Sequence, residues 1–290
     1  MVVKTEVIVR NARLEDQQKL AYLVHFDAYV HRHLDYRPPL DWLGSRPFAL
    51  AEENGKLIAA LACPPDPPRV AWIRLFAAGY AASVEAAWQA LWEESYAQLL
   101  DMPKVSWAAA IPLHPWFKQL LDQTGFVETH RIIMLAWEQQ SLPPAEKPLP
   151  RLILRPMTLD DLPRVEQIDV ASFVPVWQNS LACLEFAFRQ AAIATVAELE
   201  DRLVGYQIST PTHLGGHLAR LAVLPEMQGY GIGYSLVHDL LEQFVRRGAR
   251  LVSVNTQKNN LASQALYYKF GFALTGEEYP IYQFDLHPGE

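Results

Sequence analysis

Residues 218–234 read Leu-Ala-Arg-Leu-Ala-Val-Leu-Pro-Glu-Met-Gln-Gly-Tyr-Gly-Ile-Gly-Tyr, and this stretch decides the fold of the chain. An alternating apolar run ends at Pro225, glycines follow at 229, 231 and 233, and apolar residues at helical spacing come next. The pattern predicts a strand, a glycine turn and a helix. Glycine lets the backbone approach a ligand and adopt positive φ, and the N–H groups that open a helix attract anions. The stretch therefore predicts a phosphate-binding turn.

The spacing of this turn excludes two common phosphate-binding motifs. A dinucleotide fingerprint needs Gly-x-Gly-x-x-Gly, whereas the register here is Gln228-x-x-Gly231-x-Gly233. A P-loop needs Gly-Lys-Ser/Thr, and residues 232–234 contain no lysine. The remaining match is a Gln/Arg-x-x-Gly-x-Gly/Ala loop. It resembles the signature of the GCN5-related N-acetyltransferase (GNAT) superfamily.

A second motif follows at the expected place. Asn260 precedes Leu266-Tyr267 and Gly271-Phe272, which resembles the family's Asn…Leu-Tyr-x-x-x-Gly-Phe signature. The two motifs occur in order and are separated by a predicted helix and a strand at about 250–256. Together they favour the family over a plain structural turn.

Composition and charge limit the classes of function. The chain has 290 residues, of which 50% are hydrophobic and 20% are charged, and this length suits two domains. The net charge is −7 with no basic run, so nucleic acid is not an expected partner.

The remaining composition features point to a reduced, aqueous compartment. Cys63 and Cys183 show no metal-binding spacing, so we expect two reduced thiols and no metal. The first ten residues alternate like a strand and do not resemble a signal peptide. No apolar stretch approaches the roughly 18–20 residues of a membrane span. We therefore expect a cytoplasmic protein without membrane association.

The two halves of the chain resemble each other. The segment from Arg10 to Asp16 matches that from Arg155 to Asp161 at an offset of 145, and Gly125-Phe126 matches Gly271-Phe272 at an offset of 146. A near-constant offset indicates a duplicated domain. The predicted organisation is a degenerate domain at 1–138, a proline-rich linker at 139–150 and an acetyl-CoA-binding domain at 151–290. The predicted class is α+β: two tandem GNAT-like domains, each a mixed, mostly antiparallel sheet flanked by helices. This tandem order resembles that of mycothiol synthases.

The overlay of the halves predicts that only the second copy works. At the offset of 146, Gln228, Gly231 and Gly233 fall on Ala82, Glu85 and Ala87, and Tyr267 falls on Leu121. A glutamate would repel a pyrophosphate, and alanine lacks the conformational freedom of glycine. We expect the first copy to serve as a scaffold or as one wall of a substrate cleft.

The resemblance implies that acetyl-CoA lies between the fourth and fifth strands of the second copy, at about 217–224 and 250–256. It implies main-chain contacts with the pyrophosphate and the pantetheine, and a further contact from the residue that opens the last helix. The coenzyme-binding residues so implied are Leu221, Ala222, Val223, Gln228, Gly229, Tyr230, Gly231, Ile232, Gly233 and Asn260. Position 230 departs from the family, in which it is often basic. The side chain of Asn260 can also be explained by helix capping alone.

The resemblance also implies two catalytic residues. Tyr267 stands where the family's general acid lies and would protonate the departing thiolate; a packing role for the ring is the alternative. His217 begins the fourth strand, where histone-type relatives carry a glutamate base, and a water chain is the rival base. Attack by the amine in a ternary complex needs no enzyme nucleophile.

The acceptor surface carries no shared motif. Phe173 and Trp177 could form an aromatic wall, and Glu277 and Glu278 could hold an ammonium group, although core packing and solvation explain these residues as well. We expect an N-acetyltransferase that acts on a small-molecule or peptide amine. The alternatives are a non-catalytic acyl-CoA sensor and a purely structural double domain. One copy could fill the place that a second subunit takes in single-domain relatives, which suits a monomer with pseudo-dimeric domains, but the sequence leaves the oligomeric state open.

Overall fold

A computed structural model of the chain describes residues 7–26, 29–80, 82–138, 141–145 and 149–288. The structure divides into two compact units, Met1–Thr129 with Pro280–Glu290 and His130–Tyr279. Parts of the predicted linker, residues 139–140 and 146–148, lie outside the described residues. Within its described part, the carbonyl oxygens of Pro143 and Pro144 accept hydrogen bonds from His238 and Tyr234 of the second unit.

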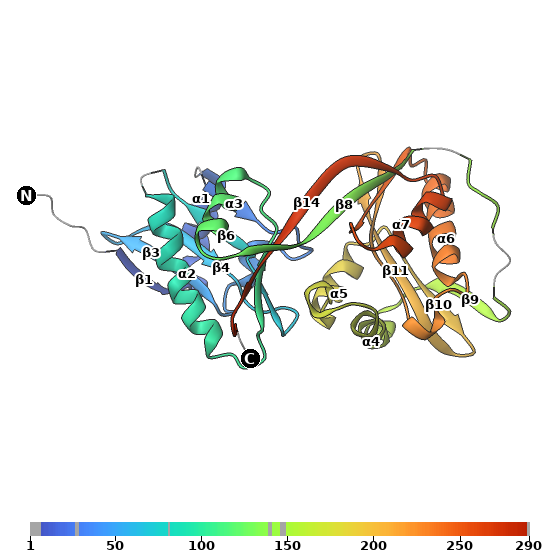
Figure 1. Ribbon diagram of the computed structural model, residues 1–290, viewed down its shortest axis with the longest axis horizontal. Coiled ribbons are helices and arrows are strands. Elements are labelled where there is room, and N and C mark those ends of the chain that lie inside the picture. The colour runs from blue at the N-terminus through green and yellow to red at the C-terminus, as the bar shows by residue number, and fades with distance from the viewer. Residues whose placement is uncertain (1–6, 27–28, 81, 139–140, 146–148, 289–290) are drawn as a thin grey trace, which may run out of the picture. The chain divides into compact units, whose positions relative to one another are not determined.

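The first unit contains two groups of strands (Figure 1). One sheet has the order β1-β3-β4-β6-β2, and a second group pairs β5 in parallel with β7, whose other edge pairs with the end of β14. Its elements are β1 (Val7–Asn11), η1 (Leu14–Asp16), α1 (Gln17–Phe26), β2 (Tyr29–Arg32), η2 (Pro39–Trp42), β3 (Phe48–Glu53), β4 (Lys56–Ala62), β5 (Val70–Trp72), β6 (Leu75–Ala78), α2 (Val84–Leu100), β7 (Trp107–Ala110) and α3 (Pro115–Gln123).

The second unit has one sheet in the order β8-β13-β12-β11-β10-β9, in which only β12 and β13 are parallel. Its elements are β9 (Leu152–Pro156), η3 (Leu159–Asp161), α4 (Leu162–Ser172), η4 (Pro175–Trp177), α5 (Leu181–Arg189), β10 (Ile193–Leu199), β11 (Arg202–Thr212), β12 (Gly215–Val223), η5 (Pro225–Met227), α6 (Ile232–Arg246), β13 (Leu251–Gln257) and α7 (Leu261–Lys269). Strands β8 (Val127–Glu138) and β14 (Ala273–Asp285) contribute residues to both units.

Each unit carries the same ion-pair cluster near its first strand. Arg10 bridges Asp16 and Glu52, each at 2.7 Å. The second unit repeats this arrangement at the offset seen in the sequence, because Arg155 bridges Asp161 and Glu198, each at 2.8 Å. The shared cluster and the shared order of elements confirm the predicted fold class of two tandem α+β repeats.

The compact units differ from the predicted domain boundaries at their last strands. Residues 132–138 of β8 pair with β13 in the second unit, and residues 282–285 of β14 pair with β7 in the first. The parallel strands β7 and β13 each have one edge left for an antiparallel partner. Each edge is covered by the closing strand of the other repeat. Strand periodicity in the sequence shows that a strand exists, but it does not show which sheet the strand joins.

Helices cover both faces of the sheet in the second unit (Figure 1). On one face, Val237, Leu240 and Leu241 of α6 form a buried cluster with Leu218 and Val254 of the sheet. On the other face, α4 and α5 lie against β11, and the buried Tyr206 of that strand bonds to Asp169 of α4. Both faces of this sheet are therefore covered by helices.

Candidate active site

Strands β12 and β13 separate near their middle. Their parallel pairing runs from Gly215↔Leu251 to Leu218↔Val254 and then stops, although the strands continue to Val223 and Gln257. The pairing of β12 with β11 skips one residue at the same place, Ala219, which forms a β-bulge. A bulge bends a strand and re-aims its side chains. The bulge thus coincides with the point where the two strands diverge.

A cavity of about 80 Å³ lies at this divergence. A cavity of this size has room for a few water molecules or for small chemical groups. The lining residues come from both strands, the wall after α4, the start of α7 and β8: Ile132, Phe173, Trp177, Leu218, Ala219, Arg220, Leu221, Val254, Asn255, Thr256, Gln257, Asn260, Ser263 and Tyr267.

The edge of β12 that faces the cavity is open beyond the bulge. The N–H of Leu224 donates to Val204 on β11, so by the alternation of an antiparallel ladder the backbone groups of Leu221 and Val223 face away from β11. The carbonyl of Val223 already accepts from Gln228 Nε2 at 3.0 Å and from Ser172 Oγ at 3.1 Å. Among the predicted coenzyme-binding residues, Leu221 has backbone groups that face the cavity. The backbone groups of Ala222 point instead toward β11.

The glycine turn has the backbone that its sequence predicts. Gly229 and Gly231 adopt φ values of +81° and +80°. A Cβ atom at Gly229 would meet nothing within 4 Å, so open space lies beside the turn. Tyr230 between them is exposed. The left-handed conformation explains why both positions need glycine.

The N-terminus of α6 is open to a ligand. Gly231 is the N-cap residue and has no side chain to cap the first N–H groups of the helix. Ile232 is fully buried under the turn, and a Cβ at Gly233 would lie 3.4 Å from Leu266 of α7, closer than most real contacts. Gly233 therefore allows α6 and α7 to approach, whereas Gly229 and Gly231 shape the backbone.

Tyr267 lies in the wall of the cavity. Its side chain is 4% exposed, and its ring packs against Phe272 with 5.6 Å between centroids. Burial raises the pKa of the Tyr267 hydroxyl above its ordinary value, so the group stays protonated through neutral pH. The hydroxyl makes no hydrogen bond to another described residue. The packed ring and the protonated hydroxyl are both compatible with the predicted donor role.

Asn260 both caps a helix and lines the cavity. Its Oδ1 accepts from the N–H of Ser263 at 3.1 Å, which is N-cap geometry for α7, and its Nδ2 donates to Gln257 Oε1 at 3.2 Å. The sequence left open whether this residue caps a helix or contacts a ligand. The cap is observed, and the position beside the cavity is compatible with both roles.

His217 lies next to the cavity and not in its wall. Its Nε2 is 3.0 Å from Asn255 Oδ1 and its Nδ1 is 2.8 Å from Ser253 Oγ. Because Oδ1 only accepts, Nε2 carries the proton and Nδ1 accepts from the serine hydroxyl. Burial lowers the pKa of His217, which keeps the ring neutral. For His217 to act as a base, the Ser253 hydroxyl would have to rotate away.

A buried ion pair that the sequence did not reveal lies behind the cavity wall formed by Phe173 and Trp177. Arg220 Nη2 lies 2.7 Å from Asp169 Oδ2, and Asp169 is fully buried. The guanidinium lies 3.8 Å over the ring of Phe173 and donates to the carbonyl of Trp177. Tyr206 also donates to Asp169. An arginine inside a strand and an aspartate inside a helix show no local motif, so only the tertiary structure brings them together.

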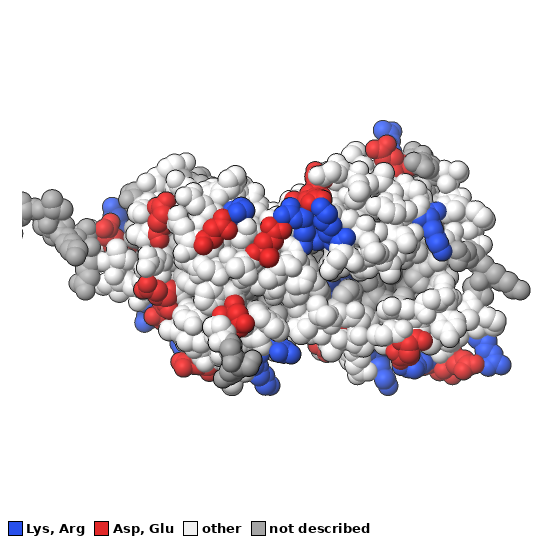
Figure 2. All heavy atoms as spheres, viewed as in Figure 1, with Lys and Arg blue, Asp and Glu red and all other residues white. Residues whose placement is uncertain are grey.

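Two predicted acceptor residues line the cavity and two do not. Phe173 and Trp177 belong to its wall. Glu278 instead pairs with Lys258 at 2.8 Å and with Arg131 at 3.5 Å, and Glu277 accepts from Tyr279. Such pairing of opposite charges is common on the surface, where blue and red residues are interspersed (Figure 2).

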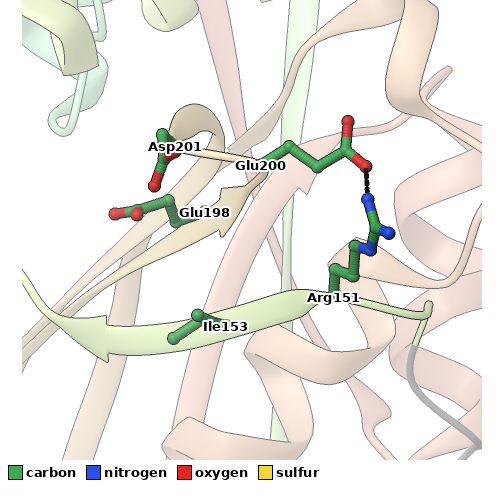
Figure 3. A pocket seen from close by; sticks show the side chains of 5 residues that line it. All are labelled: Arg151, Ile153, Glu198, Glu200 and Asp201. Atoms are coloured by element: carbon green, nitrogen blue, oxygen red, sulfur yellow. Dashed lines mark hydrogen bonds and ion pairs between the residues drawn. The ribbon is translucent and has the colours of Figure 1, made fainter.

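A larger hollow lies elsewhere in the second unit (Figure 3). It is lined by Arg151, Ile153, Glu198, Glu200 and Asp201, at the edge strand β9 and the β10–β11 turn. Arg151 and Glu200 form an ion pair of 2.6 Å there. The glycine turn and the splayed strands do not contribute to this hollow, so it is not the site that the sequence predicts.

The part of the chain that the structure describes contains neither a metal-binding cluster nor a membrane-spanning helix. Within these residues, no group of three or more His, Cys, Asp or Glu side chains is arranged to hold a metal ion. Every helix among them is too short or too polar to cross a membrane.

Comparisons with known proteins agree with this geometry. Residues 162–272 match the Acetyltransferase (GNAT) family model. An uncharacterised N-acetyltransferase of Methanocaldococcus jannaschii is 29% identical over 122 residues, which cover 42% of this chain and 78% of the relative. N-alpha-acetyltransferase 30 of Schizosaccharomyces pombe is 28% identical over 102 residues, 33% of this chain and 68% of the relative.

A solved structure shares the fold of both repeats. A tandem GNAT protein from the clavulanic acid biosynthesis pathway aligns with a TM-score of 0.62 and 14% identity, over 99% of this chain and 100% of that one. The glycine turn at the open helix, the splayed strands and these similarities lead to one conclusion: residues 162–272 belong to the acetyltransferase (GNAT) family, and the chain is an acyltransferase built from two GNAT-like repeats.

Proposed function

We propose that the second unit transfers an acetyl or other short acyl group from acetyl-CoA to a primary amine, by direct attack in a ternary complex. The observation that carries this proposal is the cavity at the divergence of β12 and β13, which joins an open strand edge to Tyr267. The glycine turn and the uncapped start of α6 supply main-chain donors for a pyrophosphate.

The residues present fit acetyl-CoA. The free backbone groups of Leu221 would pair with the amides of the pantetheine, and the N–H groups at the start of α6 would receive the phosphates. The open space beside Gly229 leaves room for the phosphates to approach the backbone. Tyr230 brings no positive charge, so the turn would bind through main-chain donors. The coenzyme would supply the activated thioester.

Tyr267 would donate to the departing sulfur. Its hydroxyl is protonated at neutral pH because burial raises its pKa. The ordinary pKa of a thiol is about 8.5, so the less acidic phenol would donate a hydrogen bond to the departing sulfur as negative charge develops on it.

The amine must be neutral when it attacks the thioester carbonyl. Its proton would leave toward water or toward His217 if the Ser253 hydroxyl rotates. The two thiols do not contribute: Cys63 is fully buried in the first unit, and Cys183 lies on α5 and is not among the cavity residues. An acyl-cysteine step has no support in this geometry.

The test is thiol release from acetyl-CoA in the presence of a panel of amines, with calorimetric binding of acetyl-CoA measured alongside. Turnover with at least one amine, lost in a Tyr267→Phe variant that still binds acetyl-CoA, is the expected result. Binding of acetyl-CoA without thiol release for any amine would identify a non-catalytic acyl-CoA sensor. The absence of binding up to millimolar acetyl-CoA would identify a structural double domain.

A further inference from the structure

The cavity wall contains one formal charge. Among its described lining residues, Arg220 is the only ionised side chain, and neither an aspartate nor a glutamate is present. A second ammonium group on the acceptor would find no carboxylate there. Because the charge of Arg220 is paired with Asp169, the wall favours a hydrogen-bond-accepting group on the acceptor.

Arg220 is held in one orientation. Its Nε donates to Asp169 Oδ2 at 2.8 Å, its Nη2 bonds to the same oxygen and to the carbonyl of Trp177, and its plane stacks on Phe173. The remaining nitrogen, Nη1, does not bond to Asp169 or to the carbonyl of Trp177, and Arg220 lines the cavity. A fixed guanidinium in such a wall suits a carboxylate or carbonyl oxygen.

Asn255 offers a second oriented donor. Its Oδ1 accepts from His217 Nε2 at 3.0 Å, and the ring is fixed in turn by Ser253 at 2.8 Å. The Nδ2 group of Asn255 makes no hydrogen bond to a described residue. Because the oxygen is occupied, Asn255 can present only its two N–H groups to the cavity.

The two donors lie on the same face of the sheet. Leu218 and Val254 pack toward α6, so the neighbouring His217 and Asn255 point to the other face. The bulge at Ala219 returns Arg220 to that face as well, where it meets Asp169 of α4. Arg220 and Asn255 therefore line the same cavity, at the point where β12 and β13 diverge and where the thioester would lie.

We propose that the acceptor is an amine with a carbonyl or carboxylate oxygen on the carbon next to its amine-bearing carbon, and that Arg220 and Asn255 bind this oxygen. The inference rests on the proposed acyl transfer in the second unit. Free α-amino acids and the N-terminal residues of peptides share this chemistry. Simple alkylamines and polyamines lack it. His217, Ser253 and Asp169 act as positioning residues for the two donors.

The experiment compares acceptors that differ only in this oxygen. Thiol release from acetyl-CoA is measured with alanine, alaninamide, an alanyl peptide, isopropylamine and putrescine, each at equal concentration of the neutral amine. We expect kcat/KM for the best oxygen-bearing acceptor to exceed that for isopropylamine and putrescine by about 100-fold, since two oriented hydrogen bonds are involved. Preference for alanine would identify a free carboxylate, and preference for the peptide would identify a carbonyl. Either preference supports the proposal.

Two variants separate recognition from folding. Asn255→Leu removes one donor without touching the buried ion pair, and Arg220→Lys keeps the charge and loses the fork. Each should lower kcat/KM for the oxygen-bearing acceptor by about 10-fold or more relative to kcat/KM for isopropylamine measured on the same variant. Arg151→Lys, which alters an exposed ion pair outside the cavity, is the matched control and should change neither value.

Two results would overturn the proposal, and they differ from each other. Equal turnover of isopropylamine or putrescine would refute the acceptor class while acyl transfer itself stands. Acetyl-CoA binding without thiol release for these five amines or for any amine of the wider panel would refute the proposed function and this inference with it.

Discussion

Two segments at equivalent positions of the repeats adopt different structures, a strand in the first unit and a turn in the second. In the first unit, β2 (Tyr29–Arg32) pairs antiparallel with β6 from Tyr29↔Ala78 to Arg32↔Leu75. In the second unit, the equivalent residues form the turn η4 (Pro175–Trp177), which stays out of the sheet and supplies Trp177 to the cavity. Pro175 has no N–H to donate to a ladder. The edge that is open in the second copy is thus closed by the chain itself in the first.

Strand β2 also fills the space that corresponds to the cavity of the second unit. His31 of β2 is fully buried, bonds through Nε2 to the carbonyl of Ile73 at 3.2 Å, and stacks on Phe117 with 4.0 Å between centroids. At the offset of 146, Ile73 and Phe117 correspond to Ala219 and Ser263, which line the cavity of the second unit. His31 of the first repeat therefore occupies the position that corresponds to the cavity of the second repeat.

The helix that follows shows the same contrast. In the first unit, Ser83 caps α2 by accepting from the N–H of Ala86 at 3.3 Å, and Glu85 brings a negative charge to the first turn. In the second unit, Gly231 leaves α6 without a side-chain cap. A side chain therefore caps the first turn of α2, whereas no side chain caps the first turn of α6.

One feature is common to both repeats. Arg74 corresponds to Arg220, pairs with Asp35 at 2.6 Å and lies over Trp42, as Arg220 pairs with Asp169 and lies over Phe173. The arginine pair is therefore part of the architecture of each unit. The difference lies around it, because His217 and Asn255 correspond to the buried Ala71 and Ala109. Both repeats therefore keep the arginine–aspartate pair and differ in the residues around it.

The largest expected effect comes from removing the hydroxyl of Tyr267, because the first copy has Leu121 at the equivalent position. Tyr267→Phe should lower kcat by about 100-fold or more, since loss of a general acid costs at least this much, while the dissociation constant of acetyl-CoA stays the same. Tyr268→Phe, at an exposed neighbour, is the control. In the wild type, the raised pKa of Tyr267 predicts no alkaline loss of kcat from this group until pH exceeds 10. An unchanged kcat in Tyr267→Phe would contradict the assigned role.

The glycine turn offers the next largest effect. Gly231→Val forces a β-branched residue into φ +80° at the uncapped helix start and should weaken acetyl-CoA binding by about 10–100-fold in calorimetry. Gly248→Val imposes the same kind of strain at φ +78°, where a new Cβ would meet no atom within 4 Å. It should lower stability by about 1–2 kcal/mol and leave binding intact. Equal binding losses in both variants would show that strain, and not the turn, was measured.

Acid stability tests what the two repeats share. Arg10 and Arg155 lower the pKa of Asp16 and Asp161 to about 2, below the ordinary 3.8. The stabilisation from each carboxylate is therefore present above about pH 4 and is lost as the pH falls through 2. Asp16→Asn and Asp161→Asn should each cost about 1–2 kcal/mol of unfolding free energy at pH 7. The difference from wild type should shrink by pH 2. A pH-independent difference in denaturant titrations would argue against this ion-pair origin.

The smallest expected effect concerns the capped helix of the first unit. Ser83→Ala should lower the unfolding free energy by about 1 kcal/mol through loss of the cap, and Ser83→Asp should restore it. Neither change should alter the affinity for acetyl-CoA or its stoichiometry, which we expect to be one per chain. A stoichiometry of two would mean that the first copy binds the coenzyme despite β2 and His31.

Much of the site could be predicted from short stretches of sequence. The strand–glycine–helix pattern located β12, the turn and α6, and the second motif located Asn260 and Tyr267 beside one cavity. These features depend on neighbours in the chain, where glycine conformation and apolar spacing act directly. The position of His217 beside the cavity was found in the same way, but its bonds to Ser253 and Asn255 were not.

The duplication and the conformation of the glycine turn could be predicted from residue order alone, because they follow from a constant offset and from local spacing. Only the tertiary structure decided that β2 closes the first copy, that the closing strands β8 and β14 contribute to both units, and that Arg220 meets Asp169 in a wall without carboxylates. The reason is physical. The partner of a strand edge depends on hydrogen bonds to residues far away in the sequence. The partner of a buried charge depends on the cost of desolvation in the folded state, and local sequence patterns specify neither partner.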